Sequence, residues 1–274
     1  MTEAIVRHYR AEDIVARILA AVRPALAPGA RLTAEALAPI DHFHGRGVIA
    51  TRELAKLLAP APGEHLLDIG CGIGGPARWF AETYRVRVTG IDLTPEFCEA
   101  GVQLTALCGL AEQVTILQGD ALALPFADRT FDRAYSQNVV MNIADKVRFY
   151  GEACRVLKPG GTLALSNLAL GPAGSPHYPT PWAATAATSF LSTPEETRSE
   201  IAAAGLEIVS FRDITADVLP GLRAMRAKIE AEGPPRLAAH VFIGPRMVEY
   251  MTNTNRNVEE GRVAMLEILA RRPA

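Results

Sequence analysis

The hydrophobic positions of this chain follow two different spacings. Apolar residues at helical spacing predict helices over 12–23 and 48–58, in the first part of the chain. Farther on, short apolar runs that end in glycine or polar residues predict buried strands at 66–69, 86–91, 114–117, 130–138 and 162–165. Strands that alternate with helical segments predict an α/β fold, in which helices cover both faces of a mostly parallel sheet.

The last third of the chain predicts two more strands, at 206–215 and 261–270, and a large insertion between them. A loop that begins at Gly171 leads to Thr193-Pro194-Glu195, where a capping residue, a proline and early acids are typical of a helix N-terminus. Residues 216–260 are too long for an ordinary connection and carry an amphipathic helical pattern. We expect this insertion to form a lid or a homodimer contact.

The most informative stretch is 66–75, Leu-Leu-Asp-Ile-Gly-Cys-Gly-Ile-Gly-Gly, where a strand breaks into a glycine turn and then a helix. Gly70, Gly72 and Gly74 allow the backbone to approach a ligand that any Cβ would block. Gly75 also completes a dinucleotide-binding pattern. The turn alone therefore predicts a nucleotide-like cofactor, including the nicotinamide cofactor of a dehydrogenase.

Two acidic residues follow at strand ends. Asp92 closes the second strand about twenty residues after the first glycine, where a carboxylate can accept hydrogen bonds from both ribose hydroxyls. Asp120, followed by Ala121, stands after the third strand, where a carboxylate can recognise an adenine amino group. A Lys-Pro-Gly-Gly turn at 158–161 then leads into the fifth strand.

In order and spacing, these motifs resemble those of the class I S-adenosylmethionine-dependent methyltransferases that act on small molecules. The chain is similar in particular to sarcosine/dimethylglycine and phosphoethanolamine N-methyltransferases. The resemblance implies a Rossmann-like seven-stranded sheet of order 3-2-1-4-5-7-6, with the seventh strand antiparallel. It implies S-adenosylmethionine as the cofactor, bound by Asp68, Gly70, Gly72, Gly74, Asp92, Leu93, Asp120, Ala121 and Gln137. Asp68 is expected to organise the turn, and Arg78 to pair with the cofactor carboxylate or with a structural partner.

We therefore expect one methyltransferase domain over 1–274. Residues 1–60 are expected to form an N-terminal helical cap, in which 26–39, between the two predicted helices, is rich in alanine, proline and glycine. Residues 61–170 are expected to form the cofactor-binding core. Residues 171–274 are expected to supply substrate-side loops, the helical insertion and the last strands.

The sequence motifs indicate the residues that bind the methyl acceptor less directly than those that bind the cofactor. In the N-methyltransferases named above, the segment that matches 136–146 runs from an acidic residue to a histidine, and here Asn138 and Asn142 hold those positions. An amide cannot act as a general base, so a base is sought elsewhere. Candidates for a catalytic role are His42, His44, Tyr9 and Asn142. Candidates for substrate binding are Tyr9, His44, Asn138, Asn142 and Trp182, whose ring can stack on a cation.

The expected activity is in-line transfer of a methyl group from S-adenosylmethionine to a small molecule, with an amine nitrogen as the preferred acceptor. The alternative is C- or O-methylation of a quinone, a phenol or a polyketide-like metabolite, which a broad apolar pocket would favour. Two other classes stay open from the residues alone. A dehydrogenase would bind a reduced dinucleotide, and a silent binding protein would have a blocked acceptor cavity.

Composition narrows the partners. The formal net charge is -2 and the sequence has no cluster of lysine and arginine, which argues against nucleic acid as a partner. No apolar run approaches the roughly 18 residues needed to span a bilayer, and the N-terminus lacks a basic and then hydrophobic signal. We expect a cytoplasmic protein without a membrane partner. The 4 cysteines and 6 histidines have no complete metal-ligand spacing, so no metal is expected.

Overall fold

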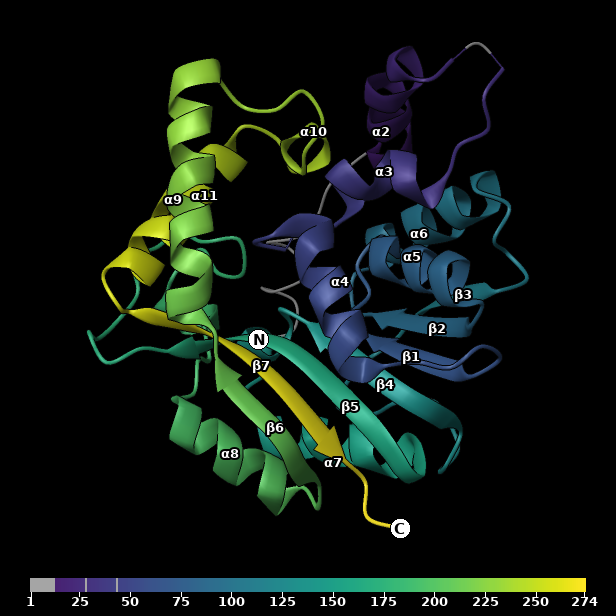
Figure 1. Ribbon diagram of the computed structural model, residues 1–274, viewed down its shortest axis with the longest axis vertical. Coiled ribbons are helices and arrows are strands. Elements are labelled where there is room, and N and C mark those ends of the chain that lie inside the picture. Colours follow the sequence, from purple (N-terminus) through teal and green to yellow (C-terminus); the bar gives the residue numbers. More distant parts are fainter. Residues whose placement is uncertain (1–12, 28, 43) are drawn as a thin grey trace.

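A seven-stranded sheet forms the centre of the computed structural model, which describes residues 13–27, 29–42 and 44–274. Its strand order is β3-β2-β1-β4-β5-β7-β6, and β7 runs antiparallel to both of its neighbours (Figure 1). The α/β fold and the predicted strand order are thereby confirmed. The strands are β1 His65–Ile69, β2 Arg87–Asp92, β3 Val114–Gln118, β4 Phe131–Gln137, β5 Leu157–Leu170, β6 Glu207–Asp213 and β7 Val263–Arg271.

Helices surround this sheet and extend beyond one of its ends. The helices at 12–23 and 48–58 that the pattern predicted correspond to α2 and α4 in the described residues. The helices are α2 Ile14–Val22, α3 Ala34–Asp41, α4 Gly47–Leu58, α5 Gly75–Tyr84, α6 Pro95–Leu107, α7 Lys146–Val156, α8 Pro194–Ala203, α9 Thr215–Glu232, α10 His240–Ile243 and α11 Arg246–Glu259. Short 3-10 turns are η1 Arg23–Ala25, η2 Val140–Asn142 and η3 Ala186–Thr188.

Successive residues of β1 show how the layers form. Leu66 and Leu67 point to opposite faces of the sheet, as neighbours on a strand must. Leu66 belongs to the core beneath α4 and α5, whereas Leu67 belongs to the core beneath α7 and α8. Both side chains are fully buried. The continuous apolar run in β1 is therefore explained by a strand that is covered on both faces.

Helix α8 begins where the sequence predicted. The Thr193 hydroxyl accepts a hydrogen bond from the Glu196 backbone N–H, and the Glu196 carboxylate accepts one from the Thr193 N–H. This reciprocal pair satisfies two backbone donors that a helix start otherwise leaves without partners.

Two segments differ from the sequence-based expectation. The segment 26–39, for which no helix was predicted, contains most of helix α3, because Thr33 caps the Ala36 N–H and the following alanines, Glu35 and Leu37 favour a helix despite Pro39. The turn at 158–161 is part of β5 itself. The register passes from the pair Phe131–Leu157 to the pair Arg133–Thr162, so these four residues bulge out of the ladder.

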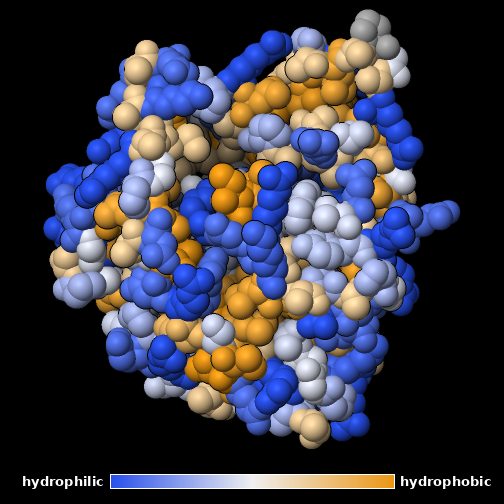
Figure 2. Space-filling model, viewed as in Figure 1, coloured by the Kyte–Doolittle hydropathy of each residue, from blue (hydrophilic) through white to orange (hydrophobic). Residues whose placement is uncertain are grey.

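The insertion at 216–260 folds into α9, α10 and α11, which stand beyond the sheet (Figure 1). A cluster of buried apolar residues joins α2, α3 and α6 to α10 and α11. A second cluster joins α9 and α11 to β5 and β7. Figure 2 shows that the surface is hollowed between α9 and α11 on one side and α2 and α3 on the other, with hydrophobic residues around the opening. Among the described residues, no helix is long and apolar enough to cross a membrane.

Candidate active site

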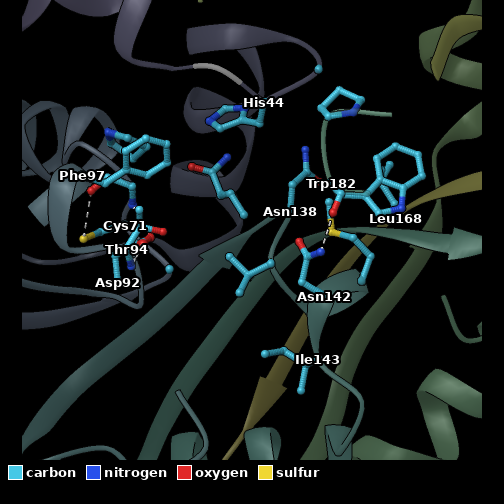
Figure 3. A pocket seen from close by; sticks show the side chains of 18 of the residues that line it. His44, Cys71, Asp92, Thr94, Phe97, Asn138, Asn142, Ile143, Leu168 and Trp182 are labelled. Atoms are coloured by element: carbon cyan, nitrogen blue, oxygen red, sulfur yellow. Dashed lines mark hydrogen bonds between the residues drawn. The ribbon is translucent and has the colours of Figure 1, made fainter. Parts of the chain in front are cut away.

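A pocket opens at the carboxyl ends of the central strands and runs towards α9 and α11. This is the edge at which open α/β sheets bind ligands. One part, called here the glycine side, is lined by Asp68, Gly70, Gly72, Asp92, Leu93, Asp120 and Ala121. The other part, called here the apolar side, is lined by Met141, Ile143, Leu168, Trp182, Leu222, Met251, Val258 and Met265. Figure 3 shows Asp92 and Thr94 at one end of the pocket, Trp182 and Leu168 at the other, and Ile143 below Asn142.

The glycine turn needs glycine for two separate reasons. Gly70 has a φ of 81°, in the left-handed region, and a Cβ there would lie 2.2 Å from Cγ2 of Val139. Its N–H donates to the Ile91 carbonyl at 2.8 Å, which ties the turn to β2. Gly74 has a φ of 77° and caps α5, but it is not among the residues that line the pocket. The structure thus places Gly70 and Gly72 at the pocket and Gly74 behind it.

Asp92 holds the glycine turn in place from the end of β2. Its Oδ2 accepts the Gly72 N–H at 2.8 Å, and its Oδ1 accepts the Thr94 N–H at 2.9 Å. Burial raises the pKa of this carboxyl, and hydrogen bonds from the backbone of Gly72, Thr94 and Leu93 and from the Thr94 side chain oppose that shift. Asp92 lines the pocket, so its carboxylate lies next to any ligand bound there.

The remaining polar residues of the glycine side are held by local hydrogen bonds. Asp120 Oδ1 accepts a hydrogen bond from the Leu122 N–H at 2.8 Å, in a local turn. The Oδ2 atom does not take part in this hydrogen bond. The Tyr135 hydroxyl donates to Asp68 Oδ2 at 3.0 Å beneath the turn. Burial raises the pKa of Asp68 to about 8, because the charged form would lie in an apolar interior.

Arg78 is a structural residue here. Its Nη2 donates to Asp41 Oδ2 at 2.8 Å, and both side chains are almost fully buried. Its Nη1 donates to the Thr105 hydroxyl at 3.1 Å. The sequence left open whether Arg78 pairs with the cofactor carboxylate or with a structural partner, and the structure shows the structural partner, Asp41. This pair fixes α3 against α5, where the Asp41 carbonyl lies so close to Gly75 that a Cβ on Gly75 would be 2.4 Å away.

Thr51 links three candidate residues, although nothing in the sequence pattern singled it out. Its Oγ1 lies 2.9 Å from Nδ1 of His42, 3.3 Å from Nε2 of His44 and 3.1 Å from Oε1 of Gln137. Gln137 and His44 line the pocket, whereas His42 does not. Burial lowers the pKa of both histidines to about 3, so both imidazoles are neutral near neutral pH.

The apolar side brings together elements that are far apart in the chain. Asn142 donates from Nδ2 to the Trp182 carbonyl at 2.6 Å, and the Trp182 indole donates to the Ser189 hydroxyl at 2.9 Å. The Trp182 side chain is thus both a core residue and part of the pocket wall. Asn138, with a φ of 54°, lines the pocket just after β4. Sequence analysis did not identify the wall that α9 and α11 supply: Leu222, Met251, Thr254, Asn255 and Val258.

Two further outcomes concern residues outside this wall. Tyr9 lies outside the residues that the structure describes. Within the described ranges, no group of three or more histidine, cysteine, aspartate or glutamate residues is arranged to hold a metal ion.

Sequence and structure comparisons place the chain among known proteins. Residues 67–165 match the family model described as a methyltransferase domain. The O-methyltransferase resE of Aspergillus sclerotiorum is 30% identical over 209 residues, which cover 74% of this chain and 75% of that protein. The phosphoethanolamine N-methyltransferase of Triticum aestivum is 34% identical over 128 residues, which cover 46% of this chain and 25% of that protein. The geranyl diphosphate C-methyltransferase of Streptomyces coelicolor A3(2) superposes with a TM-score of 0.72 at 18% identity, covering 99% of this chain and 97% of that chain.

A Rossmann-like sheet with a glycine turn is shared with nicotinamide enzymes, so the fold alone does not separate the two classes. The sequence relatives do separate them. The matched segment runs from β1 to β5 and contains the glycine turn, Asp92 and Asp120. The similarity to resE extends over about three quarters of both proteins. The chain therefore belongs to the class I S-adenosylmethionine-dependent methyltransferases, enzymes that methylate small molecules.

Proposed function

We propose that the glycine side holds S-adenosylmethionine, with Gly70 and Gly72 beneath its aminoacyl and ribose portions. Asp92 accepts hydrogen bonds from the ribose, Leu93 packs against the adenine, and Asp120 with Ala121 recognises the polar edge of the adenine. Two observations support this fit. The turn has no Cβ at Gly70 or Gly72, and Asp92 lines the pocket beside both glycines.

When bound, S-adenosylmethionine supplies a methyl group that is already electrophilic on its sulfonium sulfur. The protein then has to align the acceptor with that methyl group and keep bulk water away. The glycine side fixes one reactant through backbone and carboxylate hydrogen bonds. The apolar side excludes water around the other reactant, with α9 and α11 as its outer wall.

We further propose that the acceptor is a neutral, largely apolar molecule that is methylated on oxygen or carbon. One observation carries this proposal. The carboxylates that line the pocket, on Asp41, Asp68, Asp92 and Asp120, all lie on the glycine side or next to its turn, and among the described residues the apolar side has no charged side chain. A cationic amine would lose its hydration there without gaining a counter-ion, which is unfavourable. The preference for an amine nitrogen stays a prediction, which the same experiment tests.

The test is an acceptor panel with the purified protein and S-adenosylmethionine. Neutral phenols and naphthols of increasing size are compared with sarcosine, dimethylglycine and phosphoethanolamine, and the methylated products are identified by mass spectrometry. We expect turnover of the neutral compounds and none of the amines. Turnover confined to the amines would overturn the neutral acceptor. Calorimetric titration with S-adenosylhomocysteine, with Asp92→Ala as the control, tests the cofactor assignment separately.

The organisation of the whole chain also stays a proposal. We propose one catalytic domain with an N-terminal cap, supported by the apolar cluster that joins α2 and α3 to α10 and α11. A homodimer and a cytoplasmic location are part of the same proposal. Light scattering on the purified protein tests the dimer, and fractionation of the source cells tests the location.

A further inference from the structure

One buried hydroxyl group holds three polar side chains at the boundary between the glycine side and the apolar side. Thr51 lies on α4 and is fully buried. Its Oγ1 is within hydrogen-bond distance of His42 Nδ1, His44 Nε2 and Gln137 Oε1, at 2.9, 3.3 and 3.1 Å. His42 Nε2 also lies 3.7 Å from Asp41 Oδ1, beyond hydrogen-bond distance, so the Thr51 hydroxyl is the hydrogen-bond partner that the three side chains share.

The hydrogen atoms can be assigned by counting. A threonine hydroxyl has one hydrogen to donate and two lone pairs to accept with. The carbonyl oxygen of Gln137 can only accept, so it takes the Thr51 hydrogen. Both facing imidazole nitrogens must then donate to Thr51. His42 is therefore protonated on Nδ1 and His44 on Nε2.

This assignment determines what the pocket offers to a ligand. His44, protonated on Nε2, has a lone pair on Nδ1 and can accept a hydrogen bond there. Gln137 has two N–H groups on Nε2, which is buried and has no partner in the described part of the chain. Both residues line the pocket, and Figure 3 shows His44 above the cavity between its two ends. The boundary thus presents one acceptor and one amide donor.

We propose that Thr51 is a positioning residue that sets the tautomer of His44 and the orientation of the Gln137 amide, so that the pocket selects acceptors bearing a hydroxyl group. The hydroxyl donates its hydrogen to Nδ1 of His44, and the amide of Gln137 donates to a ligand oxygen beside it. This inference rests on the proposed function and narrows its acceptor class. Before transfer, His44 only orients the hydroxyl, since an imidazole whose pKa is lowered to about 3 is too weak a base to remove its proton. When that oxygen is the atom methylated, the C–O bond forms as the bond from sulfur to methyl breaks, S-adenosylhomocysteine is the leaving group, and the now strongly acidic proton passes to Nδ1 of His44 and on to water.

The first test reads the tautomers directly and needs no acceptor. Long-range proton–nitrogen NMR on the full chain, labelled with nitrogen-15 in its histidines, distinguishes protonated ring nitrogens from bare ones. His44→Gln and His42→Gln variants assign the signals. We expect His44 to be protonated on Nε2 and bare on Nδ1, and His42 to be protonated on Nδ1. A His44 that is protonated on Nδ1 would overturn the role of Thr51.

The second test separates positioning from stability. In Thr51→Val the hydroxyl is lost at nearly constant volume, and Thr51→Ser retains it. Thr197→Val is the matched control, because Thr197 is equally buried but donates to the Thr193 carbonyl on α8, far from this network. With the best phenol of the panel, we expect Thr51→Val to lower kcat/KM about ten- to a hundredfold. We expect affinity for S-adenosylhomocysteine to change less than about threefold, and Thr51→Ser to restore most of the activity.

Two results of this second test would overturn the inference. One is a Thr51→Val variant whose kcat/KM equals that of Thr197→Val, and the other is a Thr51→Ser variant as impaired as Thr51→Val. In each case the hydroxyl would not position the acceptor. If the enzyme methylated only amines, both the proposed neutral acceptor and the inference of a hydroxyl-bearing acceptor would be wrong. A wrong His44 tautomer, by contrast, would overturn the role of Thr51 and leave the proposed function standing.

Discussion

The two sides of the pocket are built in different ways. The glycine side is made mostly of residues 68–121, at the ends of neighbouring parallel strands, and it works through backbone geometry and fixed carboxylates. The apolar side draws on η2, β5, the loop after it, α9, α11 and β7, and it works through volume and the exclusion of water. Backbone geometry requires particular residues at particular positions, whereas an apolar wall accepts many sequences. One chain can therefore keep a shared cofactor site while its acceptor site diverges.

The largest expected effect comes from Gly70→Ala on the glycine side. The added Cβ meets Val139 at 2.2 Å and the backbone has a φ of 81°, so the turn must move. We expect unfolding free energy to fall by about 2–4 kcal/mol and affinity for S-adenosylmethionine to fall more than about a hundredfold. Gly160→Ala is the control, because Gly160 has a φ of 75° but open space around it. Equal effects at both positions, by denaturation and calorimetry, would reject the steric argument.

A charge placed on the apolar side is the next test. Leu222→Asp puts a carboxylate into the wall of the pocket, and Met225→Asp puts one on the exposed face of the same helix. For a neutral acceptor we expect Leu222→Asp to lower kcat/KM about a hundredfold, because an unpaired charge must stay hydrated. The Leu222→Asp and Met225→Asp variants should bind S-adenosylhomocysteine with similar affinity. A gain in turnover of an amine would point to the amine acceptor that the sequence favoured.

Asp92→Asn should have a smaller effect, confined to the glycine side. One side-chain oxygen becomes an NH₂ group, which cannot accept a hydrogen bond. The N–H of either Gly72 or Thr94 therefore loses its acceptor. We expect affinity for S-adenosylmethionine to fall about ten- to a hundredfold by calorimetry. Asp120→Asn retains the one acceptor that the Leu122 N–H uses, so its loss should be smaller. The reverse order of the two variants would contradict this account of Asp92.

The smallest expected effect is a change in the pH dependence of stability. Burial raises the pKa of Asp68 from its ordinary value of 3.8 to about 8. Between these values the folded state retains a proton that the unfolded state has lost, so stability falls as the pH rises. Asp68→Asn removes this proton while an amide oxygen can still accept the Tyr135 hydroxyl. We expect the variant to gain about 1 kcal/mol or more relative to the native protein between pH 5 and 8, in urea unfolding. Parallel curves would contradict the raised pKa.

Much of the sheet could be predicted from the sequence, and the failures have identifiable causes. Apolar runs and glycine turns located β1 and β2, because a strand buried on both faces leaves a continuous hydrophobic run. Helix α3 was not predicted, since the prolines and the glycine of 26–39 masked the cap at Thr33. In the candidate site, the placement of Gly70, Gly72, Asp92 and Asp120 at one pocket follows from their positions at strand ends, which meet at one edge of a parallel sheet.

The sequence by itself located the glycine turn and the strand-end carboxylates, because glycine φ angles and strand-end positions are local properties of short segments. Its similarity to known methyltransferases then distinguished S-adenosylmethionine from a nicotinamide dinucleotide. Only the tertiary structure decided which of two neighbouring histidines lines the pocket and that Arg78 pairs with Asp41. It also decided that Thr51 joins His42 and His44 to Gln137 on β4. Several of these contacts link residues that are far apart in the chain. They depend on how α3, α4, α9 and α11 are oriented on the sheet, which no local pattern records.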